Sequence, residues 1–597
     1  MTTHNKADVV TVGAGWTAAI LAQQWTAAGL NVVSLEQGPA QWTYPDFQHN
    51  HDHLKYSKRF KMMVDLSKQT WTWRPHPHAA SLPMRQFGSF HPGAGVGGAG
   101  VHWSAMVWRY LPSDFRYYSH HVERYGAERL PAGHRIQDWA VSYEELEPYY
   151  DRWEYDTGVS GTAGNLNGQL IEGGNIFEGP RSRPFPLPPI ATSVPADMFA
   201  DACRNLGYHP FVQPSSILSQ AYRDISGNTR SGCLYCGFCT RFGCEVDAKS
   251  SALTAHIPLA LQTGNYEIRP GCHVTQVNLN AEGLATGVTY VDASGKSHEQ
   301  PADVVILSAF TLENVRLLLL SRNEAHPNGI GNDRNMVGKN YTYQLWASPV
   351  TGIFKGRRFN LFMGNTSTIN VIYDFNADNF DHSELDFIGG GSIFCGVGER
   401  DPLTSVSNMP SLAGTGGGGG GESPPEWGQD LKENLRRNWD SFVPVQMQAE
   451  SLPYEDQFLD LDPTYRDAWG QPLLRITFDW HQNDYNLYRF MAQRCREILQ
   501  EMGPTRIDAE MELEPYNIHT YRSTHPTGGA IMGSDPGNSV TNKYGQVWDT
   551  PNVFVTGAAL YPQNPGANPT ATLCALAYMT AQAVLDRYFD APNEMMV

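Results

Sequence analysis

The stretch DVVTVGAGWTAAILAQQWTAAGLNVVSLE, which spans residues 8–36, establishes the fold class of this chain. Its first five residues predict an apolar strand, and the pattern G-x-G-x-x-A follows immediately. A helix with apolar positions Ile20, Leu21 and Trp25 comes next, and a second apolar strand ends at Glu36. A strand, a glycine turn, a helix and a second strand that ends in an acid are typical of a Rossmann-like nucleotide-binding unit.

The residues of this turn predict a site for a dinucleotide. Gly13 permits the tight turn, and Gly15 lets a pyrophosphate approach the N-terminus of the helix, where free N–H groups and the dipole attract anions. Ala18 takes the third position of the pattern, and Glu36, about 20 positions further on, can accept hydrogen bonds from ribose hydroxyls. A glycine turn that serves only the fold is the alternative.

A second glycine-rich segment, residues 93–109, favours a flat ligand lying against the backbone. It reads GAGVGGAGVHWSAMVWR and includes Gly97 and Gly98. So many glycines do not suit the interior of a packed helix or strand, but they let a chain approach a planar group closely. A flexible linker is the alternative, although the segment runs directly into aromatic and apolar residues.

Four of the nine cysteines lie close together in the segment SGCLYCGFCTRFGCE, residues 231–245. Thiolates with the spacing C-x2-C-x2-C-x4-C converge on one point, as they do around iron–sulfur clusters. The spacing differs from the ferredoxin run C-x2-C-x2-C-x3-C-P in its last gap and in having Glu245 where proline would stand. A three-iron cluster is favoured over a four-iron one. The predicted metal ligands are Cys233, Cys236, Cys239 and Cys244.

Three other interpretations of these cysteines stay open. Two local disulfides would leave five other cysteines, an odd number, in a fold too large to need such bonds. A structural zinc ion usually takes two separated pairs of ligands, and the middle gaps here are too short for that arrangement. Four unrelated buried thiols are the least favoured interpretation.

Composition predicts a globular protein and excludes some classes of partner. With 597 residues, of which 41% are apolar and 17% charged, the chain can form a large core and two domains. Its formal net charge of −18 argues against binding to nucleic acid and against direct adhesion to anionic lipid. No run of about 18 uncharged apolar residues occurs, so no membrane span is predicted. No secretion signal is visible, which predicts a cytoplasmic protein unless a partner with a signal carries it across.

Several further motifs show that the chain resembles the glucose–methanol–choline (GMC) oxidoreductases, which bind FAD. The resemblance spans nearly the whole length. It implies an α/β fold, α+β overall, in which a Rossmann-like FAD-binding domain is interleaved with a β-sheet substrate-binding domain. The matching motifs are SYEELEPYY (142–150), ADVVIL (302–307), VGKN (337–340), HPTGGAIMG (525–533), NVFVTG (552–557) and NPTAT (568–572).

The same resemblance implies a division into two domains. The FAD-binding domain is expected to take residues 1–345 and 511–597, and to carry the cysteine-rich iron–sulfur segment 228–250. The substrate-binding domain is expected at residues 346–510. Within it, the alternation of Leu473–Phe478 predicts a strand of a sheet that covers the flavin.

Two residues carry the expected chemistry of hydroxyl oxidation. His525 matches the position of the family's catalytic histidine and would take the hydroxyl proton, because histidine is a suitable base near neutral pH. Asn568 matches the second catalytic position and would orient the hydroxyl, since an amide donates and accepts hydrogen bonds without titrating. Capping of the helix after Pro569 is the alternative for Asn568, and both roles can hold together.

Four other residues are expected to contact FAD. Val274 is one, and Gly557 and Ala558, which follow a predicted strand, would lie near the flavin ring. His102 precedes Trp103 as the matching histidine does in pyranose oxidases, which suggests a covalent bond from His102 to FAD. A non-covalent packing role is the alternative for His102.

Within the GMC family, the chain looks most like the flavoprotein subunits of membrane-bound gluconate 2-dehydrogenases and their relatives. Those subunits carry a cysteine-rich segment similar to CGFC and RFGC of this chain. The resemblance implies a dehydrogenase for a sugar acid, sugar or polyol. Its electrons would leave through the cluster to a c-type cytochrome subunit, with a small subunit as a further partner. It also implies a place on the periplasmic face of the inner membrane.

Two other functions compete with this one. The first is a pyranose or glycoside oxidase or dehydrogenase in which the cysteines are structural, and the second is a non-catalytic electron-transfer or scaffold subunit. His525 and Asn568 together argue against the second. A gluconate carboxylate would favour an arginine in the pocket, for which Arg522 is the candidate. The run Gly414–Gly421 predicts a loop that is either a lid or an inert insertion.

Overall fold

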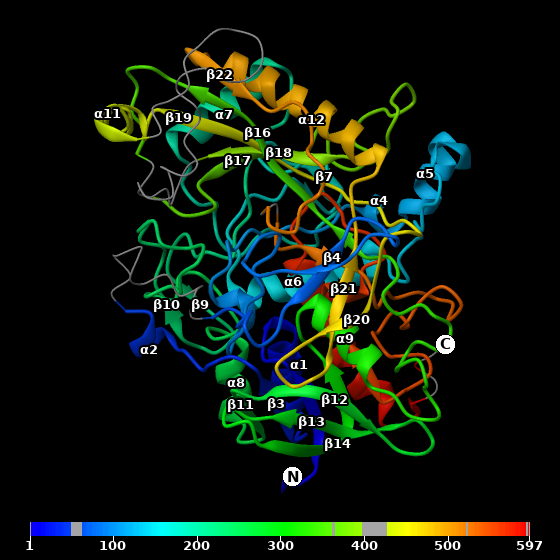
Figure 1. Ribbon diagram of the computed structural model, residues 1–597. Coiled ribbons are helices and arrows are strands. Elements are labelled where there is room, and N and C mark those ends of the chain that lie inside the picture. Colours follow the sequence, from blue (N-terminus) through cyan, green and yellow to red (C-terminus); the bar gives the residue numbers. More distant parts are fainter. Residues whose placement is uncertain are drawn as a thin grey trace.

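A computed structural model describes residues 2–48, 62–360, 364–396, 427–520, 523–592 and 595. Arg522 and the glycine run Gly414–Gly421 therefore lie outside the described residues. Figure 1 shows two main bodies of secondary structure, with the largest sheet at the bottom of the view and a second sheet at the top.

An eight-stranded sheet carries the nucleotide-binding unit and confirms the predicted fold class. Its strand order is β11-β3-β2-β14-β13-β12, with β1 and β24 also paired to β14. The pairings β11–β3–β2–β14–β24 are parallel, and β12–β13–β14 are antiparallel. The strands are β1 (Thr2–Thr3), β2 (Ala7–Val12), β3 (Val32–Glu36), β11 (Tyr266–Pro270), β12 (His273–Leu279), β13 (Ala285–Val291), β14 (Ser297–Leu307) and β24 (Val553–Val555).

Helices from the two ends of the chain pack together beside this sheet. Helix α1 (Trp16–Ala27) follows β2 directly, and α13 (Thr570–Ala583) packs against both α1 and α6 (Tyr143–Thr157). The indole Nε1 of Trp25 donates to the carbonyl oxygen of Ala581 at 3.1 Å, inside the core. The C-terminal helix therefore completes the nucleotide-binding unit that the N-terminal residues begin.

The second sheet has six antiparallel strands in the order β22-β16-β19-β18-β17-β8. Helices α12 (Gln482–Glu501) and α7 (Val194–Asn205) pack against it at the top of Figure 1. The strands are β8 (Phe211–Val212), β16 (Leu345–Ile353), β17 (Ile369–Ile372), β18 (Gly391–Gly396), β19 (Phe442–Ala449) and β22 (Arg506–Ala509).

A separate four-stranded sheet has the order β20-β21-β4-β5. The predicted strand at Leu473–Phe478 is present as β21 (Pro472–Thr477), but it pairs with β20 (Phe458–Arg466) and β4 (Trp71–Arg74), not with the six-stranded sheet. A period-2 pattern predicts a strand but not its neighbours, and the neighbour β4 comes from a distant part of the chain. The predicted domain boundaries stay a proposal.

The remaining elements are short and lie around these sheets. The other elements of the fold include β5 (Leu82–Pro83), β15 (Thr342–Tyr343), β23 (Pro526–Thr527), α2 (Thr43–Asp46), α4 (Pro112–Phe115), α5 (Tyr117–Tyr125), α8 (His256–Gln262), α9 (Thr311–Leu320) and α11 (Gly428–Asn438).

Of all described helices, none combines the length and the apolar character that a bilayer crossing requires.

Candidate active site and cysteine site

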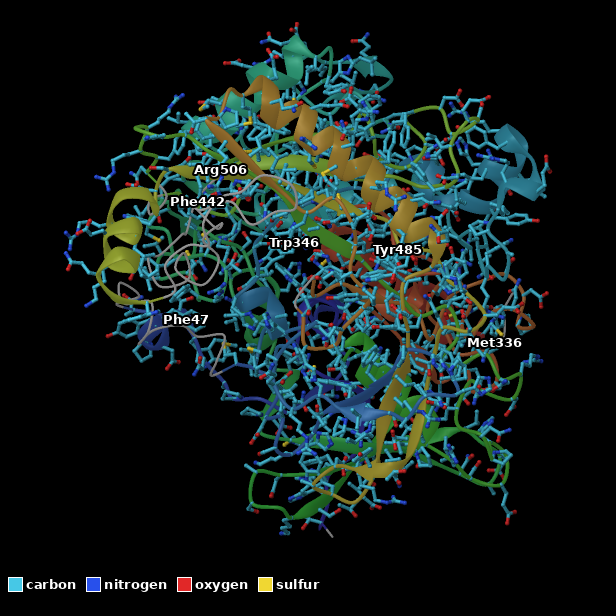
Figure 2. All side chains as sticks on the ribbon, turned by 45° about the horizontal axis from the view of Figure 1, so that its top comes forward. Phe47, Met336, Trp346, Phe442, Tyr485 and Arg506 are labelled. Atoms are coloured by element: carbon cyan, nitrogen blue, oxygen red, sulfur yellow. The ribbon has the colours of Figure 1, made fainter. Side chains whose placement is uncertain are left out.

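One large cavity, of about 1480 Å³, reaches from the glycine turn before α1 to the six-stranded sheet. Trp346, Phe442 and Arg506, from three strands of that sheet, line its far end (Figure 2). A pocket for one small ligand typically has about 300–1,000 Å³. The large cavity therefore has room for a dinucleotide and a substrate together.

The backbone at both ends of the chain is shaped to receive a flat group. Gly13, with φ +101°, and Gly15 line the cavity, and the first turn of α1 faces it. A Cβ added to Gly15 would meet only the Cα of Gly98 at 3.8 Å, and one added to Gly557 would meet no atom within 4 Å. Because these glycines face open cavity, side chains there would occupy the space that FAD requires. The site therefore fits FAD.

Glu36 ties three backbone segments together at the edge of this site. Its carboxylate accepts from the N–H groups of Ala14 at 3.1 Å, Gly38 at 2.9 Å and Gly95 at 2.9 Å. Burial raises the pKa of Glu36, while these backbone hydrogen bonds oppose the rise. The predicted contact of Glu36 with a ribose stays a proposal. This role in joining loops was not predicted from the sequence.

The other predicted FAD residues divide into two groups. Gly98, His102, Val274, Gly557 and Ala558 line the large cavity. Gly97 and Ala18 are not among its lining residues: Gly97 has φ +91° before a short 3₁₀ turn, and Ala18 is fully buried inside α1. The third position of the glycine pattern serves close packing of the helix on the sheet.

A pairing of two short strands brings Gln344 beside His525. β15 (Thr342–Tyr343) and β23 (Pro526–Thr527) are antiparallel neighbours. Gln344 follows β15 directly and His525 directly precedes β23, so the register places them opposite each other. The N–H of Gln344 donates to the carbonyl oxygen of His525 at 3.4 Å, which continues the pairing by one residue.

Gln344 determines which nitrogen of His525 carries the proton. The Nε2 of Gln344 donates to the carbonyl oxygens of Pro565 at 2.7 Å and Ala567 at 2.9 Å. Its Oε1, which can only accept, therefore faces the Nδ1 of His525 at 2.5 Å. Because an acceptor faces Nδ1, the single proton of the neutral imidazole lies on Nδ1, and the other ring nitrogen is an acceptor. Nε2 is left to take a proton.

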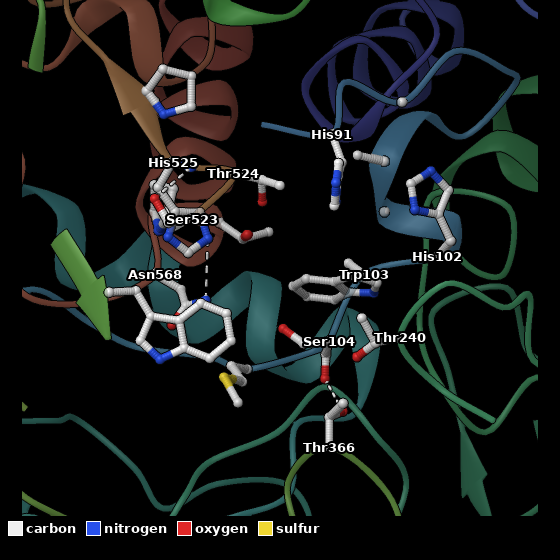
Figure 3. Close-up of a pocket in the computed structure, with 18 of the residues that line it drawn as sticks. His91, His102, Trp103, Ser104, Thr240, Thr366, Ser523, Thr524, His525 and Asn568 are labelled. Atoms are coloured by element: carbon white, nitrogen blue, oxygen red, sulfur yellow. Dashed lines mark hydrogen bonds between the residues drawn. The ribbon is translucent and has the colours of Figure 1, made fainter. Parts of the chain in front are cut away.

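Asn568 is held beside that acceptor nitrogen. Its Oδ1 accepts from Trp108 Nε1 at 2.9 Å and from Gln448 Nε2 at 3.2 Å, so its Nδ2 faces His525 Nε2 at 3.3 Å. The N-cap of α13 is Pro569 and receives no side-chain hydrogen bond. The side chain of Asn568 is thus directed to the site and not to capping, as Figure 3 shows.

Burial lowers the pKa of His525 from 6.5 to about 4. The imidazole stands in the cavity wall, and no charged group contributes to the shift. At neutral pH the ring is therefore uncharged, with one nitrogen ready to accept a proton. This is the protonation state that a general base needs.

His102 lies across the large cavity from His525. Figure 3 shows His91, His102 and Trp103 on the opposite side of the pocket from His525 and Asn568. The side chain of His102 is 2% exposed and lines the cavity at the end of the short turn Gly98–Val101. The residue is therefore placed beside the space that FAD would fill, as the predicted covalent bond requires.

The four predicted cysteine ligands line one small cavity of about 20 Å³, here called the cysteine cavity. No disulfide links any of them in the described part of the chain. No three of their sulfurs, all within the described residues, lie within 4.8 Å of one another, whereas a tetrahedral zinc ion spaces its sulfurs about 3.8 Å apart. Binding of an iron–sulfur cluster by these cysteines stays a proposal. The cysteines are Cys233, Cys236, Cys239 and Cys244.

The backbone of the cysteine loop, residues 233–244, is tightly wound. Tyr235 and Arg241 have left-handed φ values of +52° and +80°, which are uncommon for residues with a Cβ. A Cβ on Gly243 would lie 2.3 Å from the ring of Phe47, which Figure 2 labels. Such local strain is kept where the surrounding structure requires it, and often marks a functional site.

The sequence predicted His525, Asn568 and the residues that would contact FAD, but not the hydrogen bonds that orient them. Gln344, Gln448 and Trp108 were not predicted, because no local motif marks a glutamine or tryptophan as a partner of a distant histidine. The cavity wall also carries many hydroxyl and amide side chains. They include Ser104, Thr240, Ser348, Thr351, Thr366, Gln446, Gln448, Ser523 and Thr524.

Comparisons with known proteins identify a family and a fold that this chain matches. Two family models of the GMC oxidoreductases match residues 134–346 and 453–577. The chain is 40% identical to the gluconate 2-dehydrogenase flavoprotein of Pantoea cypripedii, over 99% of this chain and 95% of that protein. It is 28% identical to the fructose dehydrogenase large subunit of Gluconobacter japonicus, over 97% and 98%. Pyridoxine 4-oxidase from Mesorbium loti has the same fold, with a TM-score of 0.59 and 16% identity over 98% and 100%.

Proposed function

Because the chain belongs to the GMC oxidoreductase family, whose members bind FAD, we propose that it is a dehydrogenase for a sugar acid, sugar or polyol. The protein is an FAD-dependent oxidoreductase that acts on an alcohol group. Gluconate-like substrates are proposed because the Pantoea relative is named for gluconate and the Gluconobacter relative for fructose. Hydroxyl and amide side chains along the cavity wall suit a ligand with many hydroxyls.

The observation that carries the proposal is the 3.3 Å approach of His525 Nε2 and Asn568 Nδ2 in the wall of the large cavity. FAD, when bound, would supply the hydride acceptor. His525 would take the hydroxyl proton on Nε2, since Gln344 keeps the ring proton on Nδ1. Asn568 would donate from Nδ2 to the same hydroxyl oxygen and hold it toward the base.

Residues from both ends of the chain would hold FAD. The first turn of α1 would bind the pyrophosphate, with Glu36 at the ribose and Val274 beside it. Gly557 and Ala558 would lie along the ring. His102 would form the covalent link, which predicts that the yellow colour stays with acid-precipitated protein. A colourless pellet would remove the covalent bond and leave the rest of the proposal intact.

Electrons would leave through a three-iron cluster on the cysteine loop to a partner that carries a haem. Four cysteines around one small cavity beside the large one support this route. The Gluconobacter relative is named as a large subunit, and we extend this to a small subunit and a c-type cytochrome as partners here. The assembly would lie on the periplasmic face of the inner membrane, which cell fractionation would test.

The test of this function uses the purified protein with gluconate, 2-keto-gluconate, sorbitol, fructose and glucosides. We expect flavin and iron in the protein, bleaching of flavin absorbance by one of these substrates without oxygen, and fast turnover with an artificial acceptor. The competing oxidase hypothesis predicts the same bleaching of flavin, but no iron and consumption of oxygen with substrate. Iron-free protein that consumes oxygen with substrate would overturn the proposal.

The pH dependence of kcat/KM should report the low pKa of His525. Because the neutral imidazole is the active form, activity should stay nearly constant from pH 7 to pH 5. It should fall only as the pH drops through about 4, where His525 becomes protonated. The measurement is kcat/KM from pH 3.5 to 8, with tryptophan fluorescence as a check on folding. An acid limb near the ordinary value of 6.5 would contradict the assignment.

A further inference from the structure

The cysteine loop forms a wall between two cavities. Within residues 237–242, Thr240 and Phe242 line the large cavity, whereas Phe238 and Cys239 line the cysteine cavity. The rings of Phe238 and Phe242 meet edge to face, with centroids 5.1 Å apart and planes at 88°. One short segment therefore separates the space for FAD from the space for the cluster.

Lys249 joins this wall to the segment that carries His102. Its side chain is 2% exposed, and its Nζ donates to the carbonyl oxygens of Trp103 at 3.0 Å, Cys239 at 2.5 Å and Phe242 at 2.9 Å. An ammonium group has three N–H donors, which matches these three carbonyls. Because a buried charge is costly unless hydrogen bonds replace its hydration, the ammonium holds both segments firmly.

Two further hydrogen bonds join the same segments. The indole Nε1 of Trp103 donates to the carbonyl oxygen of Ser250, next to Lys249, at 2.9 Å. The N–H of Arg241 donates to the carbonyl oxygen of His102 at 2.9 Å. Figure 3 places His102, Trp103 and Thr240 on one side of the large cavity. The cysteine loop is thus fixed to the residues that would contact the flavin.

We propose that Lys249 is a positioning residue for electron transfer, which keeps the cysteine site at a constant separation from the FAD site. The proposal rests on the proposed function, because it requires FAD in the large cavity and a cluster in the cysteine cavity. In the step concerned, one electron at a time would pass from reduced FAD, which would be oxidised, to the cluster, which would be reduced, and no bond would form or break. The charge of Lys249 beside Cys239 also favours the reduced, more negative cluster.

The test compares wild type with Lys249→Met, which keeps the stem but removes the charge and its donors, and with Lys249→Arg, which keeps the charge. Flavin reduction by substrate should stay near the wild-type rate in both variants. Cluster reduction, followed by rapid-freeze EPR, should slow at least about tenfold in Lys249→Met, equivalent to about 1.4 kcal/mol of barrier. Lys249→Arg should recover part of that loss. Lys296→Met, at an exposed lysine in a turn, is the matched control.

Two measurements separate this proposal from the proposed function. Iron in the wild-type protein tests the proposed function, whatever the variants do. Hydrogen exchange of residues 101–104 and 237–242 tests the positioning role directly, and both segments should exchange faster in Lys249→Met even if that variant loses iron. Unchanged exchange, or cluster reduction at the wild-type rate in an iron-loaded Lys249→Met protein, would overturn the proposal.

Discussion

Replacing His525 by alanine is expected to slow the reduction of bound flavin by substrate about 10³-fold, within the range that a positioned general base contributes. His525 Nε2 is the acceptor beside Asn568 Nδ2, and Gln344 holds the ring proton on the far nitrogen. Without the imidazole, the nitrogen that accepts the hydroxyl proton is lost. Stopped-flow measurement of flavin bleaching without oxygen gives the rate directly.

The matched control is His519→Ala, since His519 is an exposed histidine outside the large cavity. Flavin and iron contents of both variants should equal those of the wild type, which excludes misfolding as the cause. His525→Asn should be as slow as His525→Ala, because an amide keeps a hydrogen bond but does not take the proton. A His525→Ala protein within tenfold of wild type would show that another group is the base.

Replacing the cysteines one at a time should separate the metal ligands from the fourth thiol. A three-iron cluster needs only three thiolates, so three of the four alanine variants should lose their iron and one should keep it. In the variants that lose iron, turnover with the physiological or artificial acceptor should fall by more than about 100-fold. Loss of a residue that only supports a metal ligand costs about 10–100-fold, and loss of the ligand itself should cost more. The variants are Cys233→Ala, Cys236→Ala, Cys239→Ala and Cys244→Ala.

Single-turnover flavin reduction should survive in these variants, because the proton acceptor and hydride acceptor stay in place. The two kinds of variant therefore differ in the step that is slowed. The cysteine variants lose the transfer of electrons to the acceptor, whereas His525→Ala loses the reduction of flavin by substrate. Cys495→Ala, in the buried core of α12, is the control for removal of a thiol. Bound zinc in place of iron, or four variants with normal acceptor turnover, would refute the cluster.

The nucleotide turn and the cysteine loop could be predicted because their groups are close in sequence. Gly13, Gly15 and Glu36 belong to one strand–helix–strand unit, and its backbone geometry follows from local patterns of glycine and apolar residues. The cysteine spacing likewise predicted that the four thiols gather around one cavity, although contacts with distant residues such as His102 and Trp103 hold the loop in place. The pairing of β21 with β4, by contrast, was not predicted, since a period-2 pattern identifies a strand but not its neighbour.

The environment of His525 depends on contacts that no local pattern encodes. Gln344 lies 181 residues from His525 in sequence, and Gln448 lies 120 residues from Asn568. Three separate strands and the start of α13 must fold before these side chains meet, because each is placed by its own element and by backbone carbonyls. The sequence alone therefore predicted only that His525 is a base and that the amide of Asn568 orients the hydroxyl. The tautomer and the lowered pKa of His525 follow from the packed fold, because burial and hydrogen-bond direction arise only there.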